Sequence, residues 1–250
     1  MHYPHNEHTI RYAEEKGVMV WEEIPVWQDI DFKDTSVKTQ ASLMLSEVIK
    51  RDQNRCNVIF WSIANETRPS KERDETLIKL AAEAKQLDAT RLVTAAFDDV
   101  SRNGNKIALK DTVMKYLDVI GINEYLGWYI PWPAPPGNME WTSDFNKPVI
   151  ISEFGGESVY HNIVDTAVKA NAWSEEYVAG IYRDQITMFG HIPFLQGVCP
   201  WVLADFRSPF RMQSTYQKGW NRKGLLSDRG EKKKAWYIMK AYYDLLKKSD

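Results

Sequence analysis

The pattern of hydrophobic positions changes repeatedly along the chain, between the spacing of an amphipathic helix and short continuous apolar runs. The apolar runs predict strands, which lie at residues 17–24, 58–63, 91–97, 118–125, 148–154 and 196–203. Helical spacing predicts helices, which lie at residues 6–16, 37–51, 77–87, 111–116, 175–189 and 235–246. Apolar strands that alternate with helices are typical of a parallel sheet covered by helices. The sequence therefore predicts an α/β fold.

Polar side chains follow the predicted strands at their carboxyl ends. These residues are Glu22, Glu23, Asn65, Glu66, Asp98, Asp99, Asn123, Tyr125, Glu153, Trp201 and Asp205. In a TIM barrel the catalytic groups come from the carboxyl ends of several strands, whereas a doubly wound sheet gathers its polar groups at one switch point. No glycine-rich phosphate loop follows any of the predicted strands. The pattern therefore favours a (β/α)8 TIM barrel.

The six predicted strands fall short of a closed barrel, which needs eight. The chain ends on a predicted closing helix, but it begins abruptly at His2, Tyr3 and Pro4. We therefore expect the first two strands to precede Met1, so that residues 1–250 form one incomplete, N-terminally truncated catalytic barrel domain.

The composition is that of an ordinary globular protein, with 44% hydrophobic and 26% charged residues. This balance argues against disorder and against a membrane protein. The 32 basic and 34 acidic residues give a formal net charge of -2, so nucleic acid is not expected as a partner. The run from Lys232 to Lys234 is short, and we interpret it as a solvated loop that leads into a helix.

The cysteines and histidines do not indicate a metal or a cofactor. Cys56 and Cys199 are far apart and have no neighbour at zinc-ligand spacing, so we interpret them as buried free thiols. His2, His5 and His8 recur at even spacing, but residues three and six apart do not share one helix face, so a zinc cluster is not expected. The opening MHYPHNEH lacks the apolar core of a secretory signal, which predicts a cytoplasmic location if translation starts here.

Aromatic residues are frequent, with 10 Trp, 12 Tyr and 9 Phe, and many lie near Asn, Asp or Glu. Aromatic faces stack on the C–H faces of sugars, while amides and carboxylates bind hydroxyl groups. Most of these aromatics are expected to pack in the core. The mixture is nevertheless typical of small-ligand pockets, and it is compatible with a carbohydrate or glycoside conjugate as the substrate.

Two glutamates are placed for glycosidase chemistry. Glu66 closes the run VIFWSIANE and Glu153 closes VIISEF, so each is expected at the end of a strand. Cleavage of a glycosidic bond needs one carboxylic acid to protonate the leaving oxygen and a second carboxylate to attack or to activate water. A single Glu more often caps a helix or forms an ion pair, but the pair, with Asn65 before Glu66, favours a glycosidase. A carboxylate separation of about 5 Å would indicate retention of configuration, and one of about 9 Å inversion.

Five stretches of the chain resemble the barrel domain of glycoside hydrolase family 2. They are HYP (2–4), RDQNRCNVIFWSIANE (51–66), NEYLGWY (123–129), ISEFG (151–155) and WVLADF (201–206). The resemblance runs in order over nearly the whole chain. It implies a retaining exo-β-glycosidase in which Glu66, at the end of strand four, is the acid/base and Glu153, at the end of strand seven, is the nucleophile. It further implies that the substrate is bound by His2, Asn65, Asn123, Tyr125, Tyr129 and Trp201.

The segment GWNRKG (219–224) resembles the Asn-x-Lys element with which β-glucuronidases hold the C6 carboxylate of their substrate. The resemblance implies that Asn221 and Lys223 make this contact, because an ammonium and an amide can donate to a carboxylate that a galactosidase never meets. In the alternative interpretation, Lys223 is simply a solvated residue of a basic loop.

Two departures from the family pattern leave the identity of the sugar open. Glu124 and Leu126 replace residues of an aromatic stretch of the β-glucuronidases, although the sugar-facing residues around them are kept. The loop at 206–220 is longer than expected, and its Arg207 and Arg211 are further candidates for a carboxylate contact. A β-galacturonidase or a β-galactosidase of the same family is therefore an alternative.

Two further functional classes are alternatives. An open sheet exposes unpaired edges, so the isolated chain could be an inactive barrel fragment. A carbohydrate-binding protein would explain the aromatics, but it would not need two strand-end glutamates. Members of the family usually carry upstream β-sandwich domains, through which the protein could form a homo-oligomer.

Overall fold

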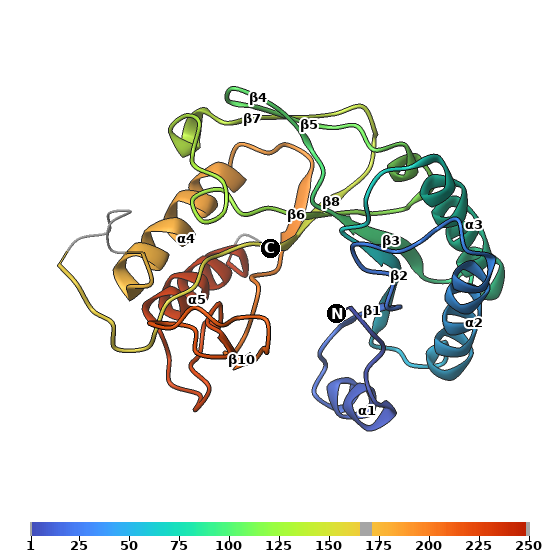
Figure 1. Cartoon of the computed structure of the whole chain (residues 1–250), viewed down its shortest axis with the longest axis horizontal. Coiled ribbons are helices and arrows are strands. Elements are labelled where there is room, and N and C mark those ends of the chain that lie inside the picture. The colour runs from blue at the N-terminus through green and yellow to red at the C-terminus, as the bar shows by residue number, and fades with distance from the viewer. Residues whose placement is uncertain (1, 166–171, 249–250) are drawn as a thin grey trace. The chain divides into compact units, whose positions relative to one another are not determined.

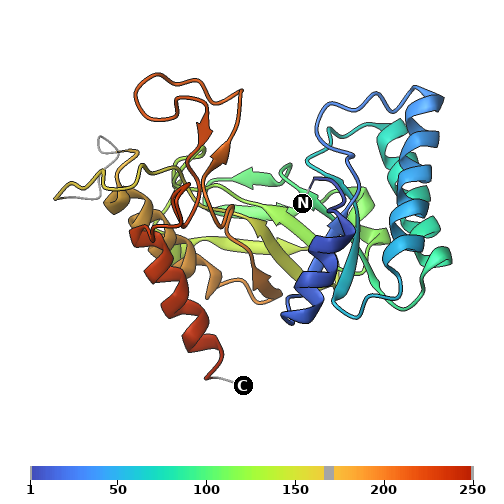
Figure 2. The ribbon, with the colours of Figure 1, turned by 90° about the horizontal axis from the view of Figure 1, so that it is seen from below.

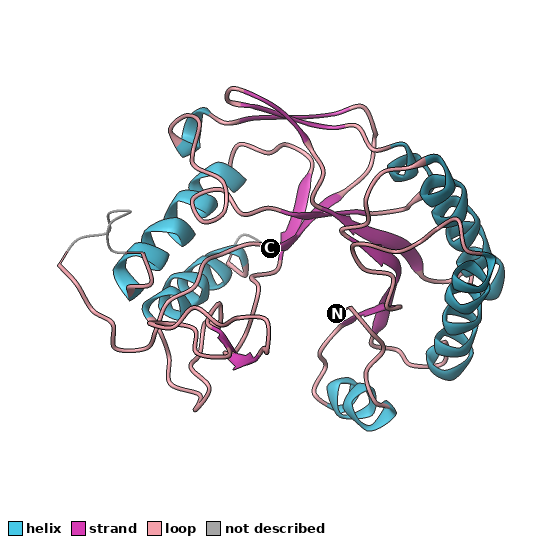
Figure 3. Cartoon of the chain, viewed as in Figure 1, coloured by secondary structure: helices cyan, strands magenta, loops and turns pink. Residues whose placement is uncertain are grey.

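The computed structural model describes residues 2–165 and 172–248. The chain divides into two compact units (Figure 1). The first comprises Met1–Ser101, Ala108–Asn123 and Thr142–Ile150, and the second comprises Arg102–Ile107, Glu124–Trp141 and Ile151–Asp250. The main sheet has six strands in the order β1-β2-β3-β6-β8-β9, which confirms the number predicted from the apolar runs. Figure 3 distinguishes the helices and strands of the chain by colour.

Strands alternate with helices in the first unit. The strands are β1 (Val20–Glu23), β2 (Val58–Asn65), β3 (Leu92–Phe97) and β6 (Ile120–Asn123), and the helices are α1 (Glu7–Glu15), α2 (Thr35–Asp52), α3 (Lys71–Leu87) and the 3-10 helix η1 (Thr112–Tyr116). β1 pairs with β2, β2 with β3, and β3 with β6, in each case in parallel. α2 and α3 lie side by side and pack on these strands (Figure 1). The parallel order places the carboxyl ends of β2 and β6 at the same edge of the sheet.

Local sequence explains why these elements begin where they do. Each helix of the first unit follows a residue whose side chain accepts a hydrogen bond from a backbone N–H of the first turn; these residues are Asn6, Asp34, Ser70 and Asp111. The central strands are buried because their residues are apolar, and Trp61, Ile63 and Val93 are fully buried. Polar residues are therefore left to the strand ends.

The second unit is built around α4 (Glu175–Phe189) and α5 (Lys234–Leu246), which pack against each other (Figure 2). Its strands are the end of β8 (Val149–Glu153), β9 (Leu195–Val198), and the antiparallel pair of β10 (Phe206–Arg207) and β11 (Trp220–Asn221). Phe154 packs against Tyr182 and Phe189 of α4, with ring centroids 5.3 and 5.0 Å away. This aromatic packing anchors the segment that directly follows Glu153.

Several short elements lie outside the predicted pattern. A small sheet contains β4 (Ser101–Asn103), β5 (Lys106–Leu109) and β7 (Glu140–Ser143), and the aromatic loop contains the 3-10 helix η2 (Pro136–Asn138). β4 is polar and exposed over its whole length, so it offers no apolar run to detect. The predicted strand at 196–203 is too long, because β9 ends at Val198. Trp201 and Asp205 therefore lie in the loop beyond the strand, after Pro200, which has no N–H to donate to a strand ladder.

The cysteines differ from their interpretation in one respect. Cys56 and Cys199 are free, but both are exposed, so their interpretation as buried thiols is wrong. Both lie in loops that flank strands, where the apolar core does not extend. Within residues 2–165 and 172–248, no helix combines the length and the apolar character needed to cross a membrane. In that same part of the chain, no three His, Cys, Asp or Glu side chains gather as metal ligands.

Candidate active site

Glu66 directly follows β2 and is held by amide groups of the first unit. Asn123, the last residue of β6, donates from Nδ2 to Glu66 Oε1 at 2.8 Å and to Asn65 Oδ1 at 3.0 Å. Gln28 donates from Nε2 to Glu66 Oε2 at 3.3 Å. Asn65 and Asn123 are each 2% exposed, so both amides are fixed by burial. The structure thus brings together three predicted site residues and adds Gln28, which lies in a loop and which the sequence pattern does not predict.

Asn65 carries a donor that the protein does not use. Its Nδ2 is buried and has no hydrogen-bond partner among the described residues. A buried donor without a partner costs free energy, so a hydrogen-bond acceptor of a bound ligand would satisfy it. Asp98 directly follows β3, the neighbouring strand of the sheet. Burial and the negative charge of Glu66 both raise the pKa of Asp98.

The two glutamates at the end of β1 have different partners. Glu23 accepts a hydrogen bond at 2.7 Å from the backbone N–H of His2, whose ring stacks on Trp27 with the centroids 5.3 Å apart. Glu22 forms an ion pair with Arg51 at 2.8 Å. Glu23 therefore positions the predicted substrate contact His2, whereas Glu22 ties β1 to the end of α2.

Glu153, the last residue of β8, lies in the second unit and is 7% exposed. The Tyr125 hydroxyl donates to Glu153 Oε2 at 2.7 Å. The backbone N–H of Glu124 donates to the Glu153 carbonyl at 2.8 Å, which ties the segment before Tyr125 to the end of β8. The ring of Tyr129 lies 5.1 Å from that of Tyr125. These contacts bring Tyr125, Tyr129 and Glu153 together.

Lys223 is buried and faces the same tyrosines. Its Nζ donates to the Tyr129 hydroxyl at 2.6 Å and lies 5.7 Å from the centre of the Tyr125 ring. Arg211 donates from Nη1 to the same Tyr129 hydroxyl at 3.1 Å. Asn221 accepts from the backbone N–H of Lys223 at 3.1 Å. Lys223 is only 2% exposed, so the interpretation of this residue as a solvated lysine is wrong.

Two other residues of the same unit have different surroundings. The guanidinium of Arg207 lies 4.4 Å from the centre of the Trp220 ring, so Arg211 is the candidate arginine that reaches Tyr129. The backbone N–H of Trp201 donates to the Phe154 carbonyl at 3.0 Å. Trp201 is therefore tied to the segment next to Glu153, although it lies beyond the end of β9.

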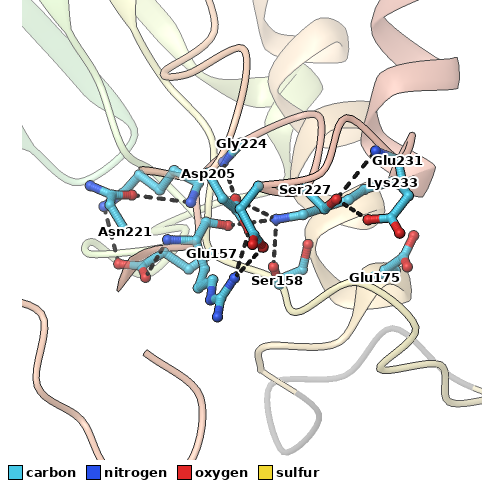
Figure 4. A network of polar contacts seen from close by, with 12 residues as sticks. Glu157, Ser158, Glu175, Asp205, Asn221, Gly224, Ser227, Glu231 and Lys233 are labelled. Atoms are coloured by element: carbon cyan, nitrogen blue, oxygen red, sulfur yellow. Dashed lines mark hydrogen bonds and ion pairs between the residues drawn. The ribbon is translucent and has the colours of Figure 1, made fainter. Parts of the chain in front are cut away.

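A buried polar network holds the segment 221–224 (Figure 4). Asp205 accepts from the backbone N–H of Gly224 at 2.9 Å and from Lys233 Nζ at 2.7 Å, and Lys233 also donates to the Ser158 carbonyl at 2.6 Å. Burial raises the pKa of Asp205 and lowers that of Lys233. Lys233 is fully buried, so the interpretation of the run 232–234 as a solvated loop is wrong at its middle residue. A lysine is buried in this way when a carboxylate and backbone carbonyls satisfy it.

Comparison with known families decides the classification. The family model described as "Glycosyl hydrolases family 2, TIM barrel domain" matches residues 1–248. This chain belongs to glycosyl hydrolase family 2. The match confirms the predicted α/β barrel class, and the six-stranded sheet agrees with that class.

The family 2 domain is similar to enzymes that include β-glucuronidases and a β-galacturonidase. The β-glucuronidase of Sus scrofa is 27% identical over 260 residues, which cover 97% of this chain and 37% of the relative. That of Streptococcus agalactiae serotype V is 28% identical and covers 97% of this chain and 44% of the relative. A β-galacturonidase from Eisenbergiella tayi, solved with bound galacturonate, has a TM-score of 0.81 at 22% identity over 98% of this chain and 44% of that protein. The chain thus spans about two fifths of the length of these relatives.

Glu124 of the family 2 domain is a buried acid whose ionisation should affect stability. Glu124 is 0% exposed, its Oε1 accepts from the backbone N–H of Leu126 at 2.5 Å, and burial raises the pKa of Glu124 from 4.5 to about 7. The native state then binds this proton more tightly than the unfolded state does. The contribution of Glu124 to the free energy of unfolding is therefore largest below pH 4.5 and is lost as the pH rises through about 7.

We expect Glu124→Gln to remove this pH dependence. At pH 8 the variant should be more stable than the parent by on the order of 2 kcal/mol, and at pH 5 the difference should be much smaller. Urea unfolding at the two pH values measures both differences. The exposed Glu140→Gln serves as the control and should leave the pH dependence unchanged. Equal stability of the Glu124 variant and the parent at pH 8 would contradict the expectation.

Proposed function

We propose that this family 2 domain is the catalytic part of a retaining exo-β-glycosidase that hydrolyses β-D-glucuronides. The observation that carries the proposal is the buried Lys223, whose ammonium group lies with Arg211 at the hydroxyl of Tyr129. Two cations at one hydroxyl form a site for a carboxylate, which a neutral sugar lacks. The names of the β-glucuronidase relatives support the same substrate class.

In the proposed mechanism, Glu153 is the nucleophile and Glu66 is the general acid/base. Glu153 attacks the anomeric carbon while Glu66 protonates the departing oxygen, which gives a covalent glycosyl ester. Glu66 then removes a proton from water, and the water displaces Glu153, so the configuration is retained. The hydrogen bond from Tyr125 orients Glu153, and the bonds from Asn123 and Gln28 orient Glu66.

A panel of nitrophenyl glycosides tests this assignment on the full-length protein. We expect the β-glucuronide to be hydrolysed with a kcat/KM at least about 100-fold above that of the β-galactoside, since a neutral sugar offers Lys223 and Arg211 no carboxylate for charge-assisted hydrogen bonds. The β-galacturonide belongs in the same panel, because it carries the same carboxylate. Preference for the galacturonide would change the assigned substrate to a β-galacturonide but leave the proposed mechanism unchanged. Binding of these sugars without hydrolysis would indicate a carbohydrate-binding protein.

Replacing Lys223 with Met should separate recognition of the carboxylate from chemistry. Methionine keeps the length and the apolar stem but removes the charge, so the hydrogen bond to the carboxylate is lost. We expect kcat/KM for the β-glucuronide to fall by roughly 100-fold, while the slow hydrolysis of the β-galactoside does not fall. Steady-state kinetics with both substrates measures the two changes.

The matched control for this variant is Lys232→Met. Lys232 is exposed, and its ammonium group lies 4.1 Å from the centre of the Trp236 ring. We expect its kinetic constants to stay within about twofold of the parent values. An equal loss of both activities in Lys223→Met would indicate a structural role for Lys223 and would remove it from substrate recognition.

A further inference from the structure

Glu157 is a buried carboxylate at the centre of the contacts around Lys223. It lies in the loop after β8 and is 1% exposed. Its Oε1 accepts from Lys223 Nζ and from Arg211 Nη1, each at 3.3 Å. Gln217 donates from Nε2 to both carboxylate oxygens, at 3.0 and 3.1 Å, and the backbone N–H of Arg222 donates to Oε2 at 3.2 Å. A carboxylate with so many donors is fixed in one orientation.

The charges around Glu157 do not balance. Lys223 and Arg211 contribute two positive charges, and Glu157 contributes one negative charge. Among the described residues, these two cations form ion pairs with Glu157 alone. Buried or half-buried charges are stable when they are paired, so one positive charge is left for a partner from outside. A monoanion such as the carboxylate of a uronic acid has the charge that is needed.

The hydroxyl of Tyr129 shows where that partner would bind. It accepts hydrogen bonds from Lys223 at 2.6 Å and from Arg211 at 3.1 Å, and an oxygen that accepts two hydrogen bonds still carries a hydrogen to donate. Two oxygens, the Tyr129 hydroxyl and Glu157 Oε1, therefore each accept a hydrogen bond from both cations and hold them close together. Without Glu157, the like charges of Lys223 and Arg211 would repel each other across the Tyr129 hydroxyl.

We propose that Glu157 is the positioning residue of the carboxylate subsite: it holds Lys223 and Arg211 at the Tyr129 hydroxyl and neutralises one of their two charges, so that the subsite takes a single negative charge. This inference rests on the proposed function, because it presumes that a sugar carboxylate is the ligand. Within the described part of the chain, the hydrogen bonds of the Glu157 side chain involve neither Glu66 nor Glu153, so Glu157 acts on binding of the acid group and not on the chemical step.

Asp205 provides a matched comparison within the same network. It braces the same segment as Glu157, since it accepts from the backbone N–H of Gly224 and from Arg222 Nη1 at 3.3 Å. It is also buried, at 6% exposure, but among the described residues it forms no hydrogen bond with the side chain of Lys223 or of Arg211. A purely structural role for Glu157 would make the two carboxylates equivalent in their effect on selectivity.

The test compares Glu157→Gln with Asp205→Asn in the full-length protein. The substrates are nitrophenyl β-D-glucuronide and nitrophenyl β-D-glucoside, which differ in the acid group alone. For Glu157→Gln we expect KM for the glucuronide to rise by about 10- to 100-fold, with kcat within about threefold and kcat/KM for the glucoside within about twofold of the parent. For Asp205→Asn we expect both substrates to be affected to the same extent.

Two results would overturn the inference. One is an unchanged selectivity between the two substrates in Glu157→Gln, and the other is an equal loss in kcat for both. If this variant does not fold, Gln217→Ala keeps all charges but releases Glu157, and it should raise KM for the glucuronide alone, by about fivefold. No change of KM in that variant would count against the role of Glu157. A parent protein that hydrolyses the glucoside as well as the glucuronide would instead overturn the proposed function itself.

Discussion

We expect Glu153→Gln to lower kcat for nitrophenyl β-D-glucuronide by on the order of 10^4-fold or more, because an amide cannot attack the anomeric carbon. The glutamine oxygen can still accept the hydrogen bond from the Tyr125 hydroxyl, so the fold around residue 153 should persist. The melting temperature of the variant should therefore stay within about 4 °C of the parent value. Single-turnover kinetics measures the chemical step, and thermal unfolding checks the fold.

The control for this loss is the exposed Glu140→Gln, which removes a weak surface ion pair with Lys106 and should keep full activity. A second experiment restores a nucleophile. In Glu153→Ala the space of the carboxylate is open to a small anion, and azide that attacks from the same side inverts the configuration once. The expected product is the α-glycosyl azide. Activity of Glu153→Gln close to that of the parent would remove Glu153 from the role of nucleophile.

The sequence predicts β2 and β3 of the main sheet closely because both strands are mostly apolar. Residues 58–63 and 91–97 fall within a residue or two of β2 and β3, and helix 175–189 coincides with α4. Short elements give no such signal. β4 has three exposed polar residues, and β10 and β11 have two residues each, so their strand conformation depends on partners distant in the sequence.

The candidate site also contains residues that the sequence predicts and residues that it does not. Asn65, Asn123 and Glu153 are readable from the sequence because they close apolar strands. Glu157 is not, because its partner Lys223 lies 66 positions away and both are loop residues with no periodic pattern. Lys233 is misread for a related reason. Hydropathy assigns each lysine to solvent by residue type, whereas the burial of Lys233 depends on Asp205, 28 positions away.

The second large effect is expected at Glu66, and it should depend on the leaving group. In Glu66→Ala no acid protonates the departing oxygen, so kcat/KM for a methyl β-glucuronide should fall by roughly 10^3-fold or more. The dinitrophenolate group of a dinitrophenyl glucuronide leaves without being protonated, so formation of the glycosyl ester with Glu153 should be much less affected. The ester should then accumulate, because its hydrolysis lacks a base. A burst of dinitrophenol in stopped-flow measurements would report this accumulation.

Azide distinguishes Glu66 from Glu153 by stereochemistry. In Glu66→Ala the ester with Glu153 still forms, and azide then attacks it from the opposite face, so two inversions give the β-glycosyl azide. The same reagent should therefore yield opposite anomers with Glu66→Ala and Glu153→Ala, which NMR of the products identifies. The reverse pairing of anomers would exchange the two roles, and an α-azide from both variants would exclude a double displacement through Glu153. Because each role predicts its own product, the assignment does not depend on the size of either rate loss.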